Sequence, residues 1–197
     1  MKVILASTSP RRIEILSKTD LKFEAHPALF EEDMSLDLDP VSLAKYLSFG
    51  KANSLVARFS DALIIGADTF IVHEGKLLGK PHTPEKSVEM LASLSGKTHS
   101  VLTGLVIIET PNGQSYSHVE ETKIKFRNLS NEEILKYVAT NEPLDKAGAY
   151  AIQGGAAEFV EKIDGDYFNV MGLPLDKLII LLDRHFGVQV KRVGQAT

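Results

Sequence analysis

The run Ala62–Ala67 constrains the fold more than any other stretch of the sequence. It is apolar at every position (Ala-Leu-Ile-Ile-Gly-Ala), so both faces of the strand that it predicts must be covered. Helices packed on both sides of a sheet are the usual cover, which indicates an α/β protein. Asp68 and Thr69 interrupt the apolar pattern before Phe70 resumes it. A carboxylate inside such a strand is rarely buried without a partner or a task, and the alternative is a bulge or a capping Asp.

The start of the chain predicts a strand, a Ser-rich loop and a helix. Val3–Leu5 is the strand, Ser9 is a natural N-cap, and Pro10 suits the first helical position. Arg11 and Arg12 fall in the first turn, at the positive end of the helix dipole, where a cation typically costs ~0.3–1 kcal/mol. The backbone amides there already favour an anion, so two added guanidinium groups predict a docked polyanion such as a phosphate chain. The alternative is a solvated first turn with a Ser cap.

Strands and helices alternate along the rest of the chain, as expected for an α/β fold. The length of 197 residues allows one domain with a sizeable core or two closely joined lobes. Hydrophobic residues (44%) and charged residues (24%) are at ordinary globular values. We predict further strands at Phe23–Pro27, Ser100–Ile108 and His118–Phe126, and helices at Pro40–Ala57, Pro84–Leu94, Glu132–Val138 and from Pro174 to Gly187.

Charge and composition exclude several classes of protein. A net charge of −4 gives no general electrostatic footprint for nucleic acid. The absence of cysteine excludes disulfides and thiol chemistry and fits a reducing compartment. No apolar run approaches membrane-spanning length, and the chain begins with a strand rather than a signal peptide. We therefore expect a soluble, cytoplasmic protein with no nucleic-acid or membrane partner.

The two common phosphate-binding fingerprints are absent. Ser95–Thr98 (Ser-Gly-Lys-Thr) resembles the end of a P-loop, but Leu91 stands where the first glycine belongs, and a strand rather than a helix follows. No G-x-G-x-x-G motif occurs either, so a dinucleotide site has no support.

Charged and small residues nonetheless follow the predicted elements at their loop ends, where α/β sheets usually bind ligands. Cations can neutralise phosphate oxygens, and isolated carboxylates can hold a hard metal or accept a proton from water. The residues alone therefore predict a phosphate-ester or anhydride hydrolase. Structural alternatives stay open: a solvated acidic loop at Glu31–Asp33, a snorkelling Lys51, and a turn-rich strand pair at Asp145–Gly155. The candidate residues are Arg11, Arg12, Glu32, Lys51, Asp68, Lys80 and the loop around Gln153.

Six short motifs, in order and over nearly the whole chain, connect the sequence to a known family. They are Leu5–Arg12 (LASTSPRR), Gly66–Thr69 (GADT), Leu78–Pro81 (LGKP), Leu94–His99 (LSGKTH) with Thr103-Gly104 beyond it, Glu142–Gly154 (EPLDKAGAYAIQG) and Asn169–Pro174 (NVMGLP). With these motifs the sequence resembles the Maf family of nucleoside triphosphate pyrophosphatases, the septum formation inhibitor proteins.

The resemblance implies a fold and a set of roles. The family is similar in fold to the inosine triphosphate pyrophosphatases, which implies one domain over residues 1–197, an elongated mixed β-sheet with flanking helices, and a cleft between two lobes. By resemblance Asp68 is the catalytic proton acceptor, and Glu32, within the acidic segment Glu31–Asp33, aligns with the metal and catalytic region. A divalent cation (Mg²⁺, Mn²⁺ or Co²⁺) is implied as cofactor, with Glu32 and Asp68 as its ligands. The substrate-binding residues implied are Ser7, Arg11, Arg12, Lys51, Thr69, Lys80 and Gln153.

Three residues match one substrate branch of the family. The branch acting on dTTP and UTP is similar in having Arg at 11, Thr at 69 and Gln at 153, and this chain has all three. The branch acting on 7-methyl-GTP has Trp in place of the first and Gln in place of the second. The resemblance thus implies a dTTP/UTP pyrophosphatase that releases the monophosphate and pyrophosphate, with modified pyrimidine nucleotides as further candidate substrates. Asp68 or a metal-bound water would supply the nucleophile.

Two other function classes stay open. One is a non-catalytic regulator of cell division acting through protein contacts, which the intact Asp68 and Lys80 disfavour. The other is a nucleic-acid-binding module, which the net charge and the lack of an aromatic-basic stripe disfavour. A homodimer is a candidate assembly.

Overall fold

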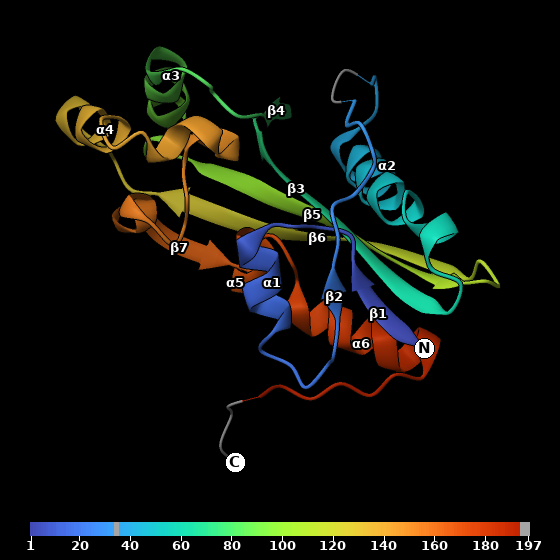
Figure 1. Cartoon of the computed structure of the whole chain (residues 1–197). Coiled ribbons are helices and arrows are strands. Elements are labelled where there is room, and N and C mark those ends of the chain that lie inside the picture. Colours follow the sequence, from blue (N-terminus) through green and yellow to red (C-terminus); the bar gives the residue numbers. More distant parts are fainter. Residues whose placement is uncertain (34–35, 194–197) are drawn as a thin grey trace. The chain divides into compact units, whose positions relative to one another are not determined.

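The computed structural model describes residues 1–33 and 36–193, which divide into two compact units. The first unit consists of Met1–Thr69, Thr103–Glu120 and Met171–Thr197, and the second of Phe70–Leu102 and Glu121–Val170. The strands are β1 (Lys2–Leu5), β2 (Glu24–Ala25), β3 (Ala62–His73), β4 (Lys76–Leu78), β5 (Thr98–Thr110), β6 (Ser115–Phe126) and β7 (Val160–Asp164) (Figure 1). The α-helices are α1 (Pro10–Leu16), α2 (Pro40–Asn53), α3 (Pro84–Leu94), α4 (Asn131–Val138), α5 (Tyr167–Met171) and α6 (Leu175–Phe186).

The strands form a mixed sheet with the hydrogen-bonded order β2-β1-β3-β5-β6-β7, and β4 pairs with β3 off this path. β1 is parallel to β2 and to β3, with Ile4 opposite Ile64. β4 is antiparallel to β3, and β7 is antiparallel to β6. The α/β class and the mixed sheet are thereby confirmed. The single domain over residues 1–197 stays a prediction.

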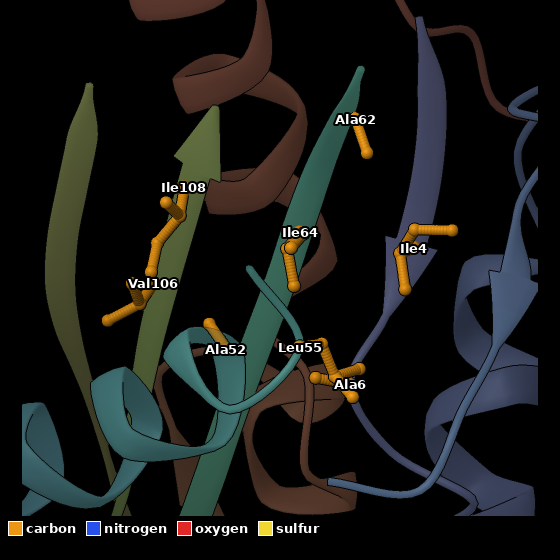
Figure 2. Packing of buried hydrophobic residues seen from close by; sticks show 8 residues of the cluster. All are labelled: Ile4, Ala6, Ala52, Leu55, Ala62, Ile64, Val106 and Ile108. Atoms are coloured by element: carbon orange, nitrogen blue, oxygen red, sulfur yellow. The ribbon is translucent and has the colours of Figure 1, made fainter. Parts of the chain in front are cut away.

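The core of the first unit forms between β1, β3, β5 and α2. Figure 2 shows α2 against one face of these strands, with α6 behind the other face, which is the two-sided cover that the apolar run Ala62–Ala67 predicts. Burying one Ile or Leu side chain stabilises the folded state by about 1.5–3 kcal/mol, because its apolar surface is removed from water. The cluster consists of Ile4, Ala6, Ala52, Leu55, Ala62, Ile64, Val106 and Ile108, with Val56 and Phe59 packed against it.

Two glycines let α2 lie directly on the sheet. A Cβ added at Gly66 in β3 would lie 2.3 Å from the carbonyl oxygen of Ser48, and one at Gly104 in β5 would lie 2.0 Å from that of Ala44. Any larger residue at either position would push the helix outward, because the clash is with helix backbone. The close approach places Lys51, near the end of α2, beside the residues that follow the apolar half of β3.

In the second unit, α3 packs against α4, and an aromatic cluster fills the space beside β5 and β6. The ring of His99 is edge-on to Phe126 and Tyr150 at centroid distances of 5.0 and 5.4 Å. Asp145–Gly155 was predicted to be either a loop of small residues that lets a ligand approach the backbone or a turn-rich pair of strands. This segment contains no strand. Instead, 3-10 turns cover residues 142–145, 147–149 and 155–159, so the strand-pair alternative is wrong. Its small residues permit tight turns that a strand does not need.

The stability of the protein should fall between pH 7 and pH 5 because of His99. Burial, assisted by the neighbouring His73, lowers the pKa of His99 to about 4, and its Nε2 lies 2.8 Å from Tyr150 Oη. Below the unfolded pKa of about 6.5, the unfolded chain therefore binds a proton that the folded chain does not, so lowering the pH favours unfolding. We expect His99 to account for about 2 kcal/mol of lost unfolding free energy between pH 7 and 5. Urea titrations of wild type and His99→Phe would check this, and equal pH slopes would contradict it.

Candidate active site

The loop between β1 and α1 is organised by Ser7 rather than by Ser9. Ser9 occupies the N-cap position of α1, but its side chain makes no capping hydrogen bond, so the predicted cap is wrong in its chemistry. Instead, the backbone N–H of Ser9 donates to Ser7 Oγ at 3.2 Å. Ser7 is buried, and its hydroxyl holds the turn through this hydrogen bond.

Arg12 is held in one orientation by three segments of the first unit. Its Nε donates to the carbonyl oxygen of Gly172 at 2.8 Å, its Nη1 to Ser7 Oγ at 3.4 Å, and its Nη2 to Thr69 Oγ1 at 3.3 Å. Thr69 Oγ1 is in turn 2.9 Å from Thr103 Oγ1. Burial lowers the pKa of the Arg12 guanidinium, and the carboxylates of Asp68 and Glu32 act in the opposite direction. The group stays charged, because an arginine does not deprotonate in a protein.

The Lys51 ammonium contacts two carboxylates, those of Asp68 and Glu32. It forms an ion pair with Asp68 Oδ1 and lies 2.8 Å from Glu32 Oε1. The Lys51 and Asp68 side chains are buried, with exposures of 11% and 9%, whereas the Glu32 side chain is 45% exposed. The buried Asp68 thus has the partner that its position in an apolar strand required, and Lys51 does not snorkel. A bulge or a capping role does not describe this Asp.

Phe30 explains how a loop residue such as Glu32 reaches a buried lysine. A Cβ at Gly50 would meet the Phe30 ring at 2.3 Å, so the ring lies in the space that this glycine leaves on α2. The ring is also edge-on to Tyr46 at a centroid distance of 5.9 Å. Two residues further along the loop, Glu32 contacts Lys51, one position after Gly50. The anchored ring therefore accounts for the ion pair between Glu32 and the buried lysine.

The arrangement of Glu32 and Asp68 fits a hard divalent cation. Both carboxylates already contact one positive charge, the Lys51 ammonium, which occupies the place between them. Mg²⁺ is commonly held by one or two carboxylates, with waters and substrate phosphate oxygens completing its coordination. Over residues 1–33 and 36–193, no group of three or more His, Cys, Asp or Glu is placed to hold a metal ion. Among the described residues, Glu32 and Asp68 are therefore the two carboxylates at Lys51 that could hold such a cation.

Three predicted site residues, Arg11, Lys80 and Gln153, take no part in the contacts described above. Arg11, half-buried beside Arg12, makes no hydrogen bond or ion pair within the described part of the chain. Lys80 and Gln153 belong to the second unit, and both are exposed. Lys80 lies in the loop after β4, next to Gly79, whose carbonyl accepts from the Gly148 N–H at 3.0 Å. Their substrate-binding roles stay predictions.

Two residues at this site were not among the candidates. Thr103 supports Thr69, and the carbonyl oxygen of Gly172 accepts from Arg12. Both occur in motifs quoted above, but a backbone carbonyl and a neutral hydroxyl in a strand carry no charge that marks them as unusual. The only signal was their place within those motifs.

Comparison with known proteins decides the family. The model of Maf-like proteins matches residues 2–185. The chain belongs to the Maf family. It is 47% identical over 189 residues to a dTTP/UTP pyrophosphatase of Moorella thermoacetica, covering 96% of this chain and 97% of the relative. It is 45% identical to a protein of that name from Geobacillus sp. (strain WCH70), covering 98% of each. The resemblance inferred from the six motifs is confirmed.

Among solved structures, a HAM1 protein from Coxiella burnetii aligns with a TM-score of 0.45 and 13% identity, covering 92% of this chain and 98% of that one.

In the described part of this Maf protein, every helix is too short or too polar to cross a bilayer.

Proposed function

We propose that this Maf protein is a nucleoside triphosphate pyrophosphatase that converts dTTP and UTP to the monophosphate and pyrophosphate. The observation that carries the proposal is the buried Lys51 between Asp68 and Glu32, next to the immobilised Arg12. Hydrolysis of a phosphoanhydride uses both kinds of group: the cations bind the phosphate oxygens, and a carboxylate accepts the proton of the attacking water. The substrate assignment is supported by relatives named dTTP/UTP pyrophosphatase at 45–47% identity.

In the proposed mechanism, Arg12, Asp68 and Lys51 each have a separate role. Arg12, whose hydrogen bonds to Ser7, Thr69 and Gly172 fix its plane, contacts phosphate oxygens without first having to be ordered. Asp68 accepts a proton from a water molecule as the water oxygen forms a bond to the α-phosphorus. The bond from the α-phosphorus to the bridging oxygen breaks, and pyrophosphate leaves with both electrons of that bond. Lys51 can offset the charge that develops on these oxygens.

A divalent cation is part of the proposal. Glu32 and Asp68 would hold it, and when bound it supplies charge neutralisation at the phosphate oxygens. The Lys51 ammonium would then interact both with these carboxylates and with the substrate.

The reaction type is tested by product analysis. Purified protein incubated with UTP and Mg²⁺ should give UMP and pyrophosphate in equal amounts, and excess EDTA should abolish turnover. Sequential release of single phosphates would instead indicate a different hydrolase. No turnover across a panel of nucleotides and metals would favour the non-catalytic regulator.

Replacing Gln153 with Glu should lower activity selectively on pyrimidine substrates. A uracil or thymine edge presents an N3–H donor beside carbonyl acceptors, and a glutamine amide can accept from one and donate to the other. Glutamate can only accept, so one base oxygen loses its donor and faces a negative charge. We expect kcat/KM for UTP and dTTP to fall about 10- to 150-fold. Steady-state kinetics on UTP and GTP would check this, and equal losses on both would assign Gln153 to the phosphates or the fold.

A further inference from the structure

Gln153 lies at the exposed tip of a tight turn in the second unit. The Gly154 N–H donates to the carbonyl oxygen of Ala151 at 3.1 Å, which puts Ile152 and Gln153 at the two central positions of a four-residue turn. Gln153 is exposed, and its amide makes no hydrogen bond to any residue that the structure describes. The backbone of the turn therefore decides where this side chain points.

Both ends of this turn are attached to one pair of side chains, Tyr137 and Glu142, which we call the clamp. The Ala151 N–H donates to Tyr137 Oη at 3.2 Å. The Tyr137 hydroxyl donates to Glu142 Oε1 at 3.1 Å. The Gly155 N–H, beyond the other end of the turn, donates to Glu142 Oε2 at 3.2 Å. The tyrosine hydroxyl thus joins the start of the turn to the carboxylate that holds its end.

The residues after Gln153 are shaped to admit the clamp. A Cβ at Gly154 would lie 1.8 Å from Glu142 Oε1, so no other residue at 154 is compatible with the carboxylate in its place. A Cβ at Gly155 would lie 3.0 Å from a ring carbon of Tyr137. The two glycines let the backbone come close enough to bind both clamp residues.

The two clamp residues are themselves held by further contacts within the second unit. Tyr137 lies on α4 with 5% exposure, and its ring is edge-on to Phe159 at a centroid distance of 5.3 Å. A complete capping box between Ser130 and Glu133 fixes the start of this helix. The backbone N–H of Glu142 donates to Thr140 Oγ1 at 3.2 Å, which fixes the backbone from which the carboxylate extends.

We propose that Tyr137 and Glu142 are positioning residues that aim Gln153 at the pyrimidine base. This inference rests on the proposed function, in which Gln153 recognises the base. Tyr137 uses its hydroxyl proton on Glu142 and accepts from Ala151, so it acts through the turn and not on the substrate. Loosening the turn costs selectivity for the base, because a two-point hydrogen bond tolerates little displacement. The phosphates do not depend on the turn.

The test compares Tyr137→Phe, Gln153→Ala and the double variant. Tyr137→Phe removes the hydroxyl that both hydrogen bonds share, and we expect kcat/KM for UTP to fall about tenfold, mainly through KM. Inorganic tripolyphosphate, which has no base, should inhibit all variants as it inhibits wild type. The double variant should be no worse on UTP than Gln153→Ala alone. Tyr167→Phe, which removes an exposed hydroxyl from the same unit, is the matched control and should change nothing.

A second variant, Glu142→Gln, keeps the proposal testable if Tyr137→Phe does not fold. Glu142→Gln keeps the size of the side chain but loses one of its two acceptor oxygens, and it should give the same selective loss. Losses that multiply in the double variant, or weaker inhibition by tripolyphosphate, would overturn the inference, because the clamp would then serve the fold or the phosphates. If Gln153→Ala itself leaves the preference for UTP over GTP unchanged, the base assignment in the proposed function is wrong, and the inference falls with it.

Discussion

Asp68→Asn should lower kcat on UTP by about 10²–10⁴-fold, the range that general-base assistance contributes. The amide keeps the shape of the carboxylate but cannot accept the proton of the attacking water. Folding should survive, since Lys51 keeps its ion pair with Glu32 at 2.8 Å. Single-turnover measurements at saturating UTP would isolate the chemical step.

The matched control for this variant is Asp183→Asn, an exposed carboxylate in the last turn of α6, which should retain wild-type turnover. Near-normal turnover by Asp68→Asn would mean that the carboxylate serves only to pair with Lys51. The proton would then have to be accepted elsewhere, and the proposed mechanism would be wrong at its central step.

Local signals in the sequence predicted most elements of the fold, but α2 ends at Asn53 rather than at Ala57, and β7 and α5 were not predicted. α3 begins and ends where predicted, at Pro84 and Leu94. α6 ends at Phe186 and is capped by Gly187, whose positive φ of 66° is typical of a helix C-cap. Such signals depend on residues a few positions apart. The strand through Ala62–Ala67 was equally clear, because continuous apolar residues require cover on both faces.

The arrangement of the site was harder to predict, because it depends on contacts between distant residues. Asp68 was recognised as unusual, but nothing local shows that Lys51 reaches it. That contact depends on the close approach of α2 to β3 and β5 at Gly66 and Gly104. Likewise, the role of Phe30 follows only from the space above Gly50. A glycine in a sequence does not tell which backbone or ring will occupy the space it leaves.

Lys51→Met should destabilise the first unit by about 3–5 kcal/mol, the usual cost of removing one partner of a buried ion pair. The Lys51 and Asp68 side chains are 11% and 9% exposed, so the orphaned carboxylate has little access to water. Methionine fills a similar volume without the charge. Lys45→Met, on an exposed face of the same helix, is the matched control and should cost little. Urea unfolding of the three proteins in EDTA would measure the difference.

The same variant tests whether Glu32 and Asp68 hold a divalent cation. Without the ammonium between them, the two carboxylates are left with uncompensated negative charge, which a bound cation can neutralise. A ligand that binds only the folded state stabilises it in proportion to the logarithm of its concentration above Kd. Mg²⁺ should therefore raise the unfolding free energy of Lys51→Met more than that of wild type, in which the ammonium competes for the same oxygens. An equal response in both proteins would place the metal away from this pair of carboxylates.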